Sequence, residues 1–120
     1  MMQGWNGYRD LLLSRVGDFA QHGPEVVRGF VALDDAPSKT SRLKPKVREL
    51  ITLAVAVPTR CDGCIAVQTC KAVEHGATMG GITGALSVAI ALNAGAAMAY
   101  LARVLDAHAQ LTRLSCALCR

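Results

Sequence analysis

The sequence predicts an all-α protein, a single-domain bundle of about six helices, on three observations. Apolar residues make up 52% of the 120 residues, and alanine, leucine, valine and glycine supply most of their bulk. Ala and Leu favour helix, whereas a domain built of strands would contain more Ile, Thr, Tyr and Phe. Apolar residues recur at helical spacing between Gly and Pro breaks. Because 120 residues fit one domain and leave no room for a second, we expect a single domain over residues 1–120.

Two helices are expected before a polar loop. Apolar positions at helical spacing predict the first over about Trp5 to Gln21. Pro24 suits the first turn of the second helix, which we expect to continue to Leu33. Residues 34–44 contain Pro37 and several hydroxyl side chains, so we expect a loop there.

A third helix is expected from Pro45 to about Val57, where Pro58 ends it. Its spacing predicts five apolar residues on the inward face, namely Val47, Leu50, Ile51, Ala54 and Val55.

The second half of the chain predicts three more helices. One runs from about Asp62 to Glu74 and ends at Gly76, a typical helix C-terminal glycine. Thr78 is a candidate cap for the next helix, which we expect to end near Leu92. Asn93 then opens a last helix to about Leu111.

Charge and apolar content exclude several classes of function. The net charge is +4, but the basic residues are scattered and no stacking aromatics accompany them, so no nucleic-acid partner is expected. Residues 77–102 carry no charge, so this stretch is a candidate for a membrane span. The segment is rich in Ala and Gly, and Asn93 and Gly95 interrupt it, so buried helices and subunit interfaces explain it better.

The cysteines point to a reducing compartment. Residues 1–16 carry charges and no apolar stretch typical of a signal peptide, so we expect a cytoplasmic protein. Five cysteines in such a chain bind metal, do chemistry or lie inert in the core. Cys116 and Cys119 form a second CxxC, and a four-cysteine zinc site is the structural alternative. The 51 residues between the pairs exceed the spacing of compact zinc folds, and we expect neither a metal nor a cofactor.

The central motif is Cys61-Asp62-Gly63-Cys64. Positions three apart share a helix face, so both thiols can meet and close a disulfide. The pair lies at the expected start of a helix, where free backbone amides stabilise a thiolate, the reactive form of cysteine. Arg60 adds a positive charge. These features predict a redox-active dithiol.

Two polar residues extend this candidate site. Glu49 lies on an otherwise apolar stripe of the third helix, and a partly buried carboxylate there indicates a function. A salt bridge to Lys46 or Arg48 is the structural alternative. Gln68 shares the face of the two thiols in the fourth helix.

These elements together resemble the carboxymuconolactone decarboxylase superfamily, and within it the alkyl hydroperoxidase D-like branch. The resemblance covers about residues 45–105 and rests on Glu49 to Val57, Cys61 to Val67, Gly76-Ala77-Thr78 and Ala91 to Gly95, in that order. It implies an alkyl hydroperoxidase D-like helical subunit that assembles into a homo-oligomer, a trimer or hexamer. It also implies a thiol-dependent peroxidase that reduces alkyl hydroperoxides.

The same resemblance assigns roles to the site residues. Cys64 resembles the cysteine that attacks the peroxide, Cys61 its disulfide partner, and Glu49 the carboxylate of a proton relay. The family's relay histidine falls at Gln68, and its histidine between the cysteines falls at Gly63. Glutamine cannot pass a proton at neutral pH, so we expect a lower peroxidase efficiency.

The reductant implied is a lipoyl-based or thioredoxin-like dithiol protein. A redox sensor or dithiol exchange protein without catalysis is the alternative function. Lactone decarboxylation, the superfamily's other chemistry, has no need of paired thiols.

Overall fold

The computed structural model describes residues 2–40 and 42–113, which form five helices and no strand. The prediction of an all-α fold is therefore confirmed. The helices are α1 (Trp5–His22), α2 (Pro24–Thr40), α3 (Pro45–Ala56), α4 (Asp62–Glu74) and α5 (Met79–Arg113).

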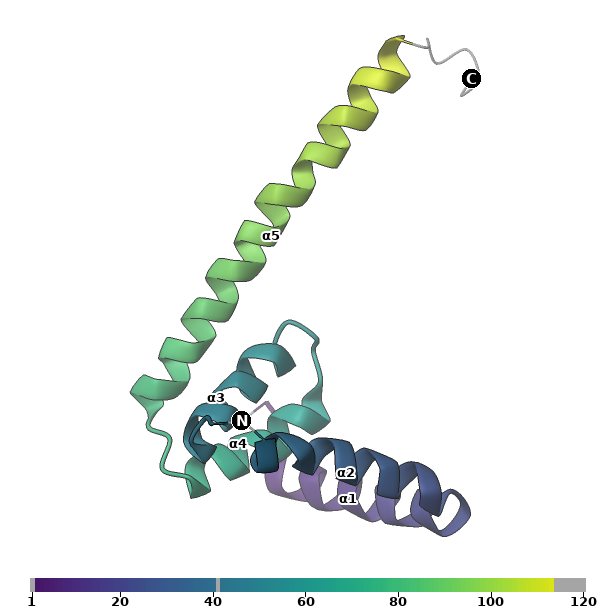
Figure 1. Cartoon of the computed structure of the whole chain (residues 1–120), viewed down its shortest axis with the longest axis vertical. Helices are drawn as coiled ribbons and strands as arrows, with labels where there is room; N and C mark the ends of the chain where they lie inside the picture. The colour runs from purple at the N-terminus through teal and green to yellow at the C-terminus, as the bar shows by residue number, and fades with distance from the viewer. Residues whose placement is uncertain (1, 41, 114–120) are drawn as a thin grey trace.

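Helices α1 to α4 form a cluster from which α5 projects (Figure 1). A turn at Gly23 joins α1 and α2 into an antiparallel hairpin, and α1 packs on α4. Helix α3 lies against both α4 and α5. The buried side chains are few and small, so the core of one chain is thin. They are Leu53, Ala56, Ala66, Ala72 and Ala89.

Helix α2 is longer than the sequence predicted. It continues past Leu33 to Thr40 with Pro37 inside it, where we expected a loop. Side chains support this last turn: the Ser38 hydroxyl donates to the carbonyl of Asp35 at 2.7 Å, and the Thr40 hydroxyl donates to that of Ala36 at 3.2 Å. These bonds satisfy carbonyls near the proline, so the polar residues extend the helix here.

The described residues form five helices where about six were predicted for the chain, because α5 does not break at Asn93. The Asn93 side-chain amide donates to the carbonyl of Ala89 at 2.7 Å, so this residue bonds within the helix and does not cap a new one. Gly95 lies inside α5 as well, and a glycine in a helix interior costs only about 1 kcal/mol.

The apolar face predicted for α3 is only partly the buried one. Leu53 and Ala56 are buried, and they lie on the stripe that carries Glu49. Val47, Ile51 and Val55, expected to face inward, are 37%, 48% and 57% exposed. The prediction was wrong for these residues because spacing alone does not distinguish the core of one chain from a surface that another molecule covers.

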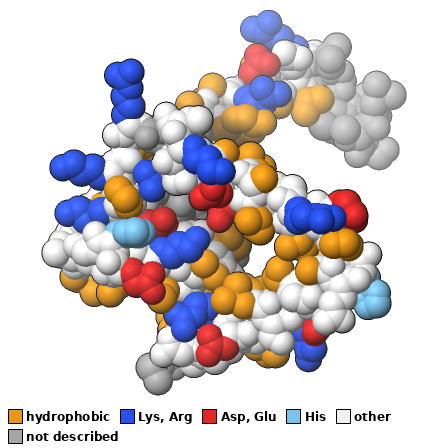
Figure 2. Space-filling view, turned by 60° about the horizontal axis from the view of Figure 1, so that its bottom comes forward, with side chains coloured by type: hydrophobic (Ala, Val, Ile, Leu, Met, Phe, Trp, Pro, Cys, Tyr) orange, Lys and Arg blue, Asp and Glu red, His pale blue; other side chains and the backbone are white. Residues whose placement is uncertain are grey.

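Helix α5 is almost uncovered. Every residue from 90 to 113 is exposed, and Ala89 is the one buried residue of the helix. By length and composition alone, α5 is apolar enough to cross a membrane. The radius of gyration is 20.6 Å, against about 14 Å for a compact domain of this length. Figure 2 shows hydrophobic side chains open on the surface of the helix cluster, between charged ones.

Candidate functional site

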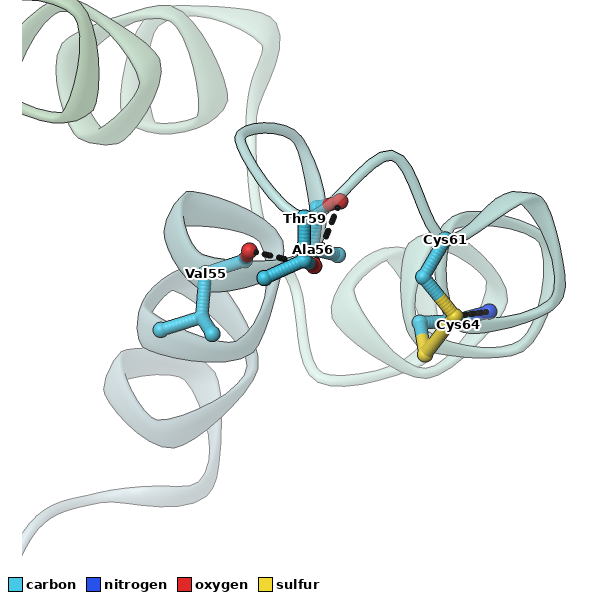
Figure 3. The surroundings of a disulfide bond; sticks show 5 residues. All are labelled: Val55, Ala56, Thr59, Cys61 and Cys64. Atoms are coloured by element: carbon cyan, nitrogen blue, oxygen red, sulfur yellow. Dashed lines mark hydrogen bonds between the residues drawn. A yellow bond between two sulfur atoms is a disulfide. The ribbon is translucent and has the colours of Figure 1, made fainter. Parts of the chain in front are cut away.

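The first turn of α4 holds a disulfide between Cys61 and Cys64, as Figure 3 shows. The two Cα atoms are 5.2 Å apart, a separation that suits a disulfide. Cys61 is the N-cap residue of the helix, and its sulfur accepts the backbone N–H of Cys64 at 3.1 Å. Cys61 is half-buried and Cys64 is exposed. Cys64 is therefore the more exposed residue of the pair.

The turn before Cys61 fixes the pair to the end of α3. The N–H of Arg60 donates to the carbonyl of Val57 at 3.0 Å, and the N–H of Cys61 donates to that of Ala56 at 3.1 Å. This is the Schellman pattern, in which the penultimate residue adopts a left-handed backbone. The Thr59 hydroxyl donates to the same Ala56 carbonyl (Figure 3). Because Ala56 is buried, Cys61 is held on the core of the chain.

Arg60 occupies the left-handed position of this turn, with φ of 54°. The same pattern ends α4, where Gly76 has φ of 83° and the N–H of Ala77 donates to the carbonyl of Ala72. Glycine adopts this backbone without strain, whereas other residues pay for it. A short turn over residues 59–61 was expected, but its left-handed backbone at Arg60 was not, since the usual glycine is absent.

We expect Arg60→Gly to raise the free energy of unfolding by about 1 kcal/mol, or roughly 4 °C in Tm, because it removes left-handed strain. Gly76→Ala is the matched control and should lower stability by a similar amount, since it introduces that strain. Thermal unfolding of the oxidised protein at one fixed protein concentration measures both. A lower Tm for Arg60→Gly would show that the arginine side chain contributes more than its backbone costs.

Gly63, between the two cysteines, lies under α1. A Cβ atom at this position would come within 2.7 Å of a Leu12 methyl carbon. The glycine therefore allows α1 to pack against the first turn of α4. A histidine here, as in the family pattern, would require Leu12 to move.

Glu49 and Gln68 line the same hollow, which lies between α2, α3 and α4 and has a volume of about 1060 Å³. Both side chains are half-buried. The Thr52 hydroxyl, which also lines the hollow, donates to the Glu49 backbone carbonyl at 2.6 Å and lies 3.4 Å from Glu49 Oε2. The structure thus brings together the two polar residues that the sequence singled out.

The cysteines do not line this hollow. Gln68 lies one turn after Cys64 on the same face of α4, which connects the hollow to the disulfide along the helix. The expected alternative for Glu49, a salt bridge to Lys46 or Arg48, is not found among the described residues. Arg48 donates instead to the carbonyl of Leu43 at 2.8 Å.

Charges of both signs surround the hollow. Lys71 Nζ of α4 lies 3.9 Å from an Asp34 carboxylate oxygen of α2, an exposed pair that contributes little stability. The hydrogen bond from Lys39, with help from Ser38, lowers the pKa of Asp35. The stability that this pair adds to the fold is therefore fully present at pH values above the ordinary pKa of Asp35. It is lost as the pH falls through the lowered pKa of the folded protein.

Cys70 of α4 has a partner of its own on α1. Arg9 Nη1 of α1 donates to its sulfur at 2.9 Å, and the Cys70 thiol donates to Glu74 at 3.6 Å. This contact ties α1 to α4. Sequence reasoning missed it because 61 positions separate the two residues.

In the described part of the chain, no three His, Cys, Asp or Glu side chains gather as a metal site. Cys116 and Cys119 lie outside the described residues.

The carboxymuconolactone decarboxylase family model matches residues 24–107, which include α2 to α4 and most of α5. This chain belongs to the carboxymuconolactone decarboxylase family. The match contains the disulfide and both polar residues of the hollow, so the candidate site lies within the family's own domain.

Bacterial proteins are similar to this chain in sequence. A protein of Haemophilus influenzae is 38% identical over 108 residues, which cover 90% of this chain and 96% of the relative. A Paracoccus denitrificans protein described as "Uncharacterized protein 4 in cox locus" is 32% identical over 90 residues, covering 75% and 81%.

A solved structure shares the fold. It is the apo crystal structure of a carboxymuconolactone decarboxylase family protein from Legionella pneumophila, with a TM-score of 0.70 and 28% identity. The match covers 88% of this chain and 95% of that one. The helical arrangement is therefore that of the family.

Proposed function

We propose that this chain is a thiol-dependent peroxidase of the alkyl hydroperoxidase D-like branch, which reduces alkyl hydroperoxides through the Cys61–Cys64 pair. The observation that carries the proposal is the disulfide at the N-terminus of α4, with one cysteine exposed. Because the two cysteines lie in the same helical turn, the pair can change between the dithiol and the disulfide there. Gln68 lies one turn further along α4, and Glu49 of α3 lines the same hollow as Gln68.

The reaction has three balanced steps. The Cys64 thiolate attacks the peroxide ROOH, so that an S–O bond forms, the O–O bond breaks, and ROH leaves after protonation. The Cys61 thiol then attacks the sulfenic acid, which forms the disulfide and releases water. An external dithiol reduces this disulfide by exchange and is itself oxidised.

The geometry supports this division of roles. Cys64 is exposed, so a peroxide can reach it. Cys61 caps the helix and is the more buried of the two, as suits the resolving thiol. Helix N-terminal amides favour both thiolates. Because the protein works reduced and oxidised in turn, we propose a cytoplasmic location with a lipoyl-based or thioredoxin-like protein as the dithiol donor.

The stoichiometry of a single turnover tests the proposal. Fully reduced protein mixed without oxygen with one equivalent of cumene hydroperoxide should form one equivalent of cumyl alcohol and lose two thiols per chain. Peptide mapping should then find Cys61 joined to Cys64. With excess dihydrolipoamide, alcohol should continue to form at one equivalent per dithiol oxidised.

Other outcomes separate the alternatives. A disulfide that forms once, with slow further turnover, would favour the redox sensor or dithiol exchange protein, which the absence of a relay histidine at Gln68 also favours. Cys61 and Cys64 left unlinked while peroxide is consumed would refute the proposed cycle. Lactone decarboxylation is disfavoured because it has no need of the disulfide.

A further inference from the structure

Most of helix α5 is not covered by the other helices of its own chain. Its 35 residues span about 52 Å as one continuous helix, and α3 is its main packing partner. Figure 1 shows it running away from the other helices. Its distal part leaves large apolar side chains in water: Met98 and Val104 are each 68% exposed and Leu105 is 65% exposed.

The uncovered area is too large for a lone chain. The accessible surface is 9475 Å², about 3,200 Å² more than a folded monomer of this mass presents. Permanent assemblies bury about 2,000 to 5,000 Å² per interface counted over both partners, or about 1,000 to 2,500 Å² from each chain, and a chain in a ring contributes to two interfaces. The excess therefore matches what a chain loses when it joins further copies of itself.

The pattern on distal α5 favours a protein surface over a bilayer. Arg103, Asp106, Gln110 and Arg113 share one side of the helix, while Leu101, Val104 and Leu105 lie on the other, with His108 and Thr112 among them. A helix that crosses lipid is apolar all round, whereas one that lies on a protein is apolar on one side. A bilayer would also leave the exposed apolar residues of α2 and α3 in water.

The hollow has the size and the lining to receive such a helix. Its volume of about 1060 Å³ exceeds most small-molecule pockets and equals about nine residues of a helix 10 Å wide. The α2 side contributes Val27, Phe30, Val31 and Leu33. On α3, the apolar Val47, Ile51 and Val55 are exposed as well, although they do not line the hollow.

We infer that distal α5 of a second copy of this chain lies across the hollow between α2 and α3 and roofs Glu49 and Gln68. The assembly then completes each site with a helix from a neighbour. The apolar side of α5 contacts Phe30 and its neighbours, and its charged side faces solvent. The inference rests on the proposed function only where it treats Glu49 and Gln68 as part of the reactive site.

A photo-crosslink tests the placement without any need for activity. Phe30 is replaced by benzoylphenylalanine, and this protein is refolded with an excess of ¹⁵N-labelled wild-type chain. After irradiation and tryptic digestion, the modified peptide should be joined to the heavy peptide 104–113. Attachment to light peptides alone, to a heavy peptide from another helix, or to none would overturn the inference.

A matched pair of α5 variants tests the interface. Leu105→Glu, on the apolar side, should reduce the mass seen by light scattering to that of one chain and cut peroxide consumption at least tenfold. Ala99→Glu, on the charged side near Arg103, should keep the wild-type mass and rate. Circular dichroism must show equal helix content. An assembled Leu105→Glu protein overturns the inference.

Two further results distinguish the sources of failure. A correct crosslink in a protein that consumes no peroxide refutes the proposed function and leaves the interface standing. Wild-type protein that stays monomeric and inserts α5 into phosphatidylcholine vesicles, with peptide 104–113 protected from protease, assigns the helix to a bilayer and overturns the inference.

Discussion

Cys64→Ser is expected to lower peroxide consumption by at least about 10³-fold, or about 4 kcal/mol of barrier. The sulfur of the exposed Cys64 is the proposed nucleophile, and a serine hydroxyl at the same place has no neighbouring base strong enough to activate it. The measurement is the initial rate of cumene hydroperoxide loss with excess dihydrolipoamide.

Two other cysteine variants separate the roles. Cys61→Ser should still consume one equivalent of peroxide per chain, but the product is a sulfenic acid that dimedone labels at Cys64. Cys70→Ser is the control, because that thiol contacts Arg9 away from the disulfide, and its rate should equal the wild type. Full activity in Cys64→Ser, or its loss in Cys70→Ser, would reassign the nucleophile.

The helix boundaries set by local chemistry could be predicted from the sequence. The α4 helix has the expected span from Asp62 to Glu74, since it begins at a capping residue and ends at Gly76. The Thr78 hydroxyl accepts the N–H of Gly81 at the start of α5, as expected for a cap. Pro37 and Asn93 misled the prediction because each is a helix breaker only by tendency, and hydrogen bonds made by nearby side chains outweigh that tendency.

The candidate site also has features that the sequence predicts and features that only the structure shows. That Cys61 and Cys64 meet follows from helical spacing alone, and so does the face they share with Gln68. Two features needed three dimensions. The Arg9–Cys70 contact joins distant residues, and the left-handed Arg60 lacks the glycine that marks such turns. Spacing also cannot tell whether an apolar residue such as Ile51 faces its own core or another chain.

Gln68→His is expected to raise peroxide turnover at neutral pH by roughly tenfold, or about 1.4 kcal/mol of barrier. Position 68 lines the hollow with Glu49 and follows Cys64 by one helical turn, so a histidine there can take the thiol proton. A general base contributes about 10²- to 10⁴-fold. The gain here should be smaller, because the surrounding residues are fitted to glutamine.

The gain should depend on Glu49, because its carboxylate lines the same hollow and would orient the new imidazole and stabilise its charged form. Glu49→Gln in the Gln68→His background should therefore remove most of it, while Glu49→Gln in the wild type changes the rate less. The four proteins form a double-mutant cycle whose coupling energy measures the relay. If Gln68→His leaves the rate unchanged while the disulfide still forms, the thiol loses its proton without a relay through this hollow. The sensor or exchange function then becomes the better account of the Cys61–Cys64 pair.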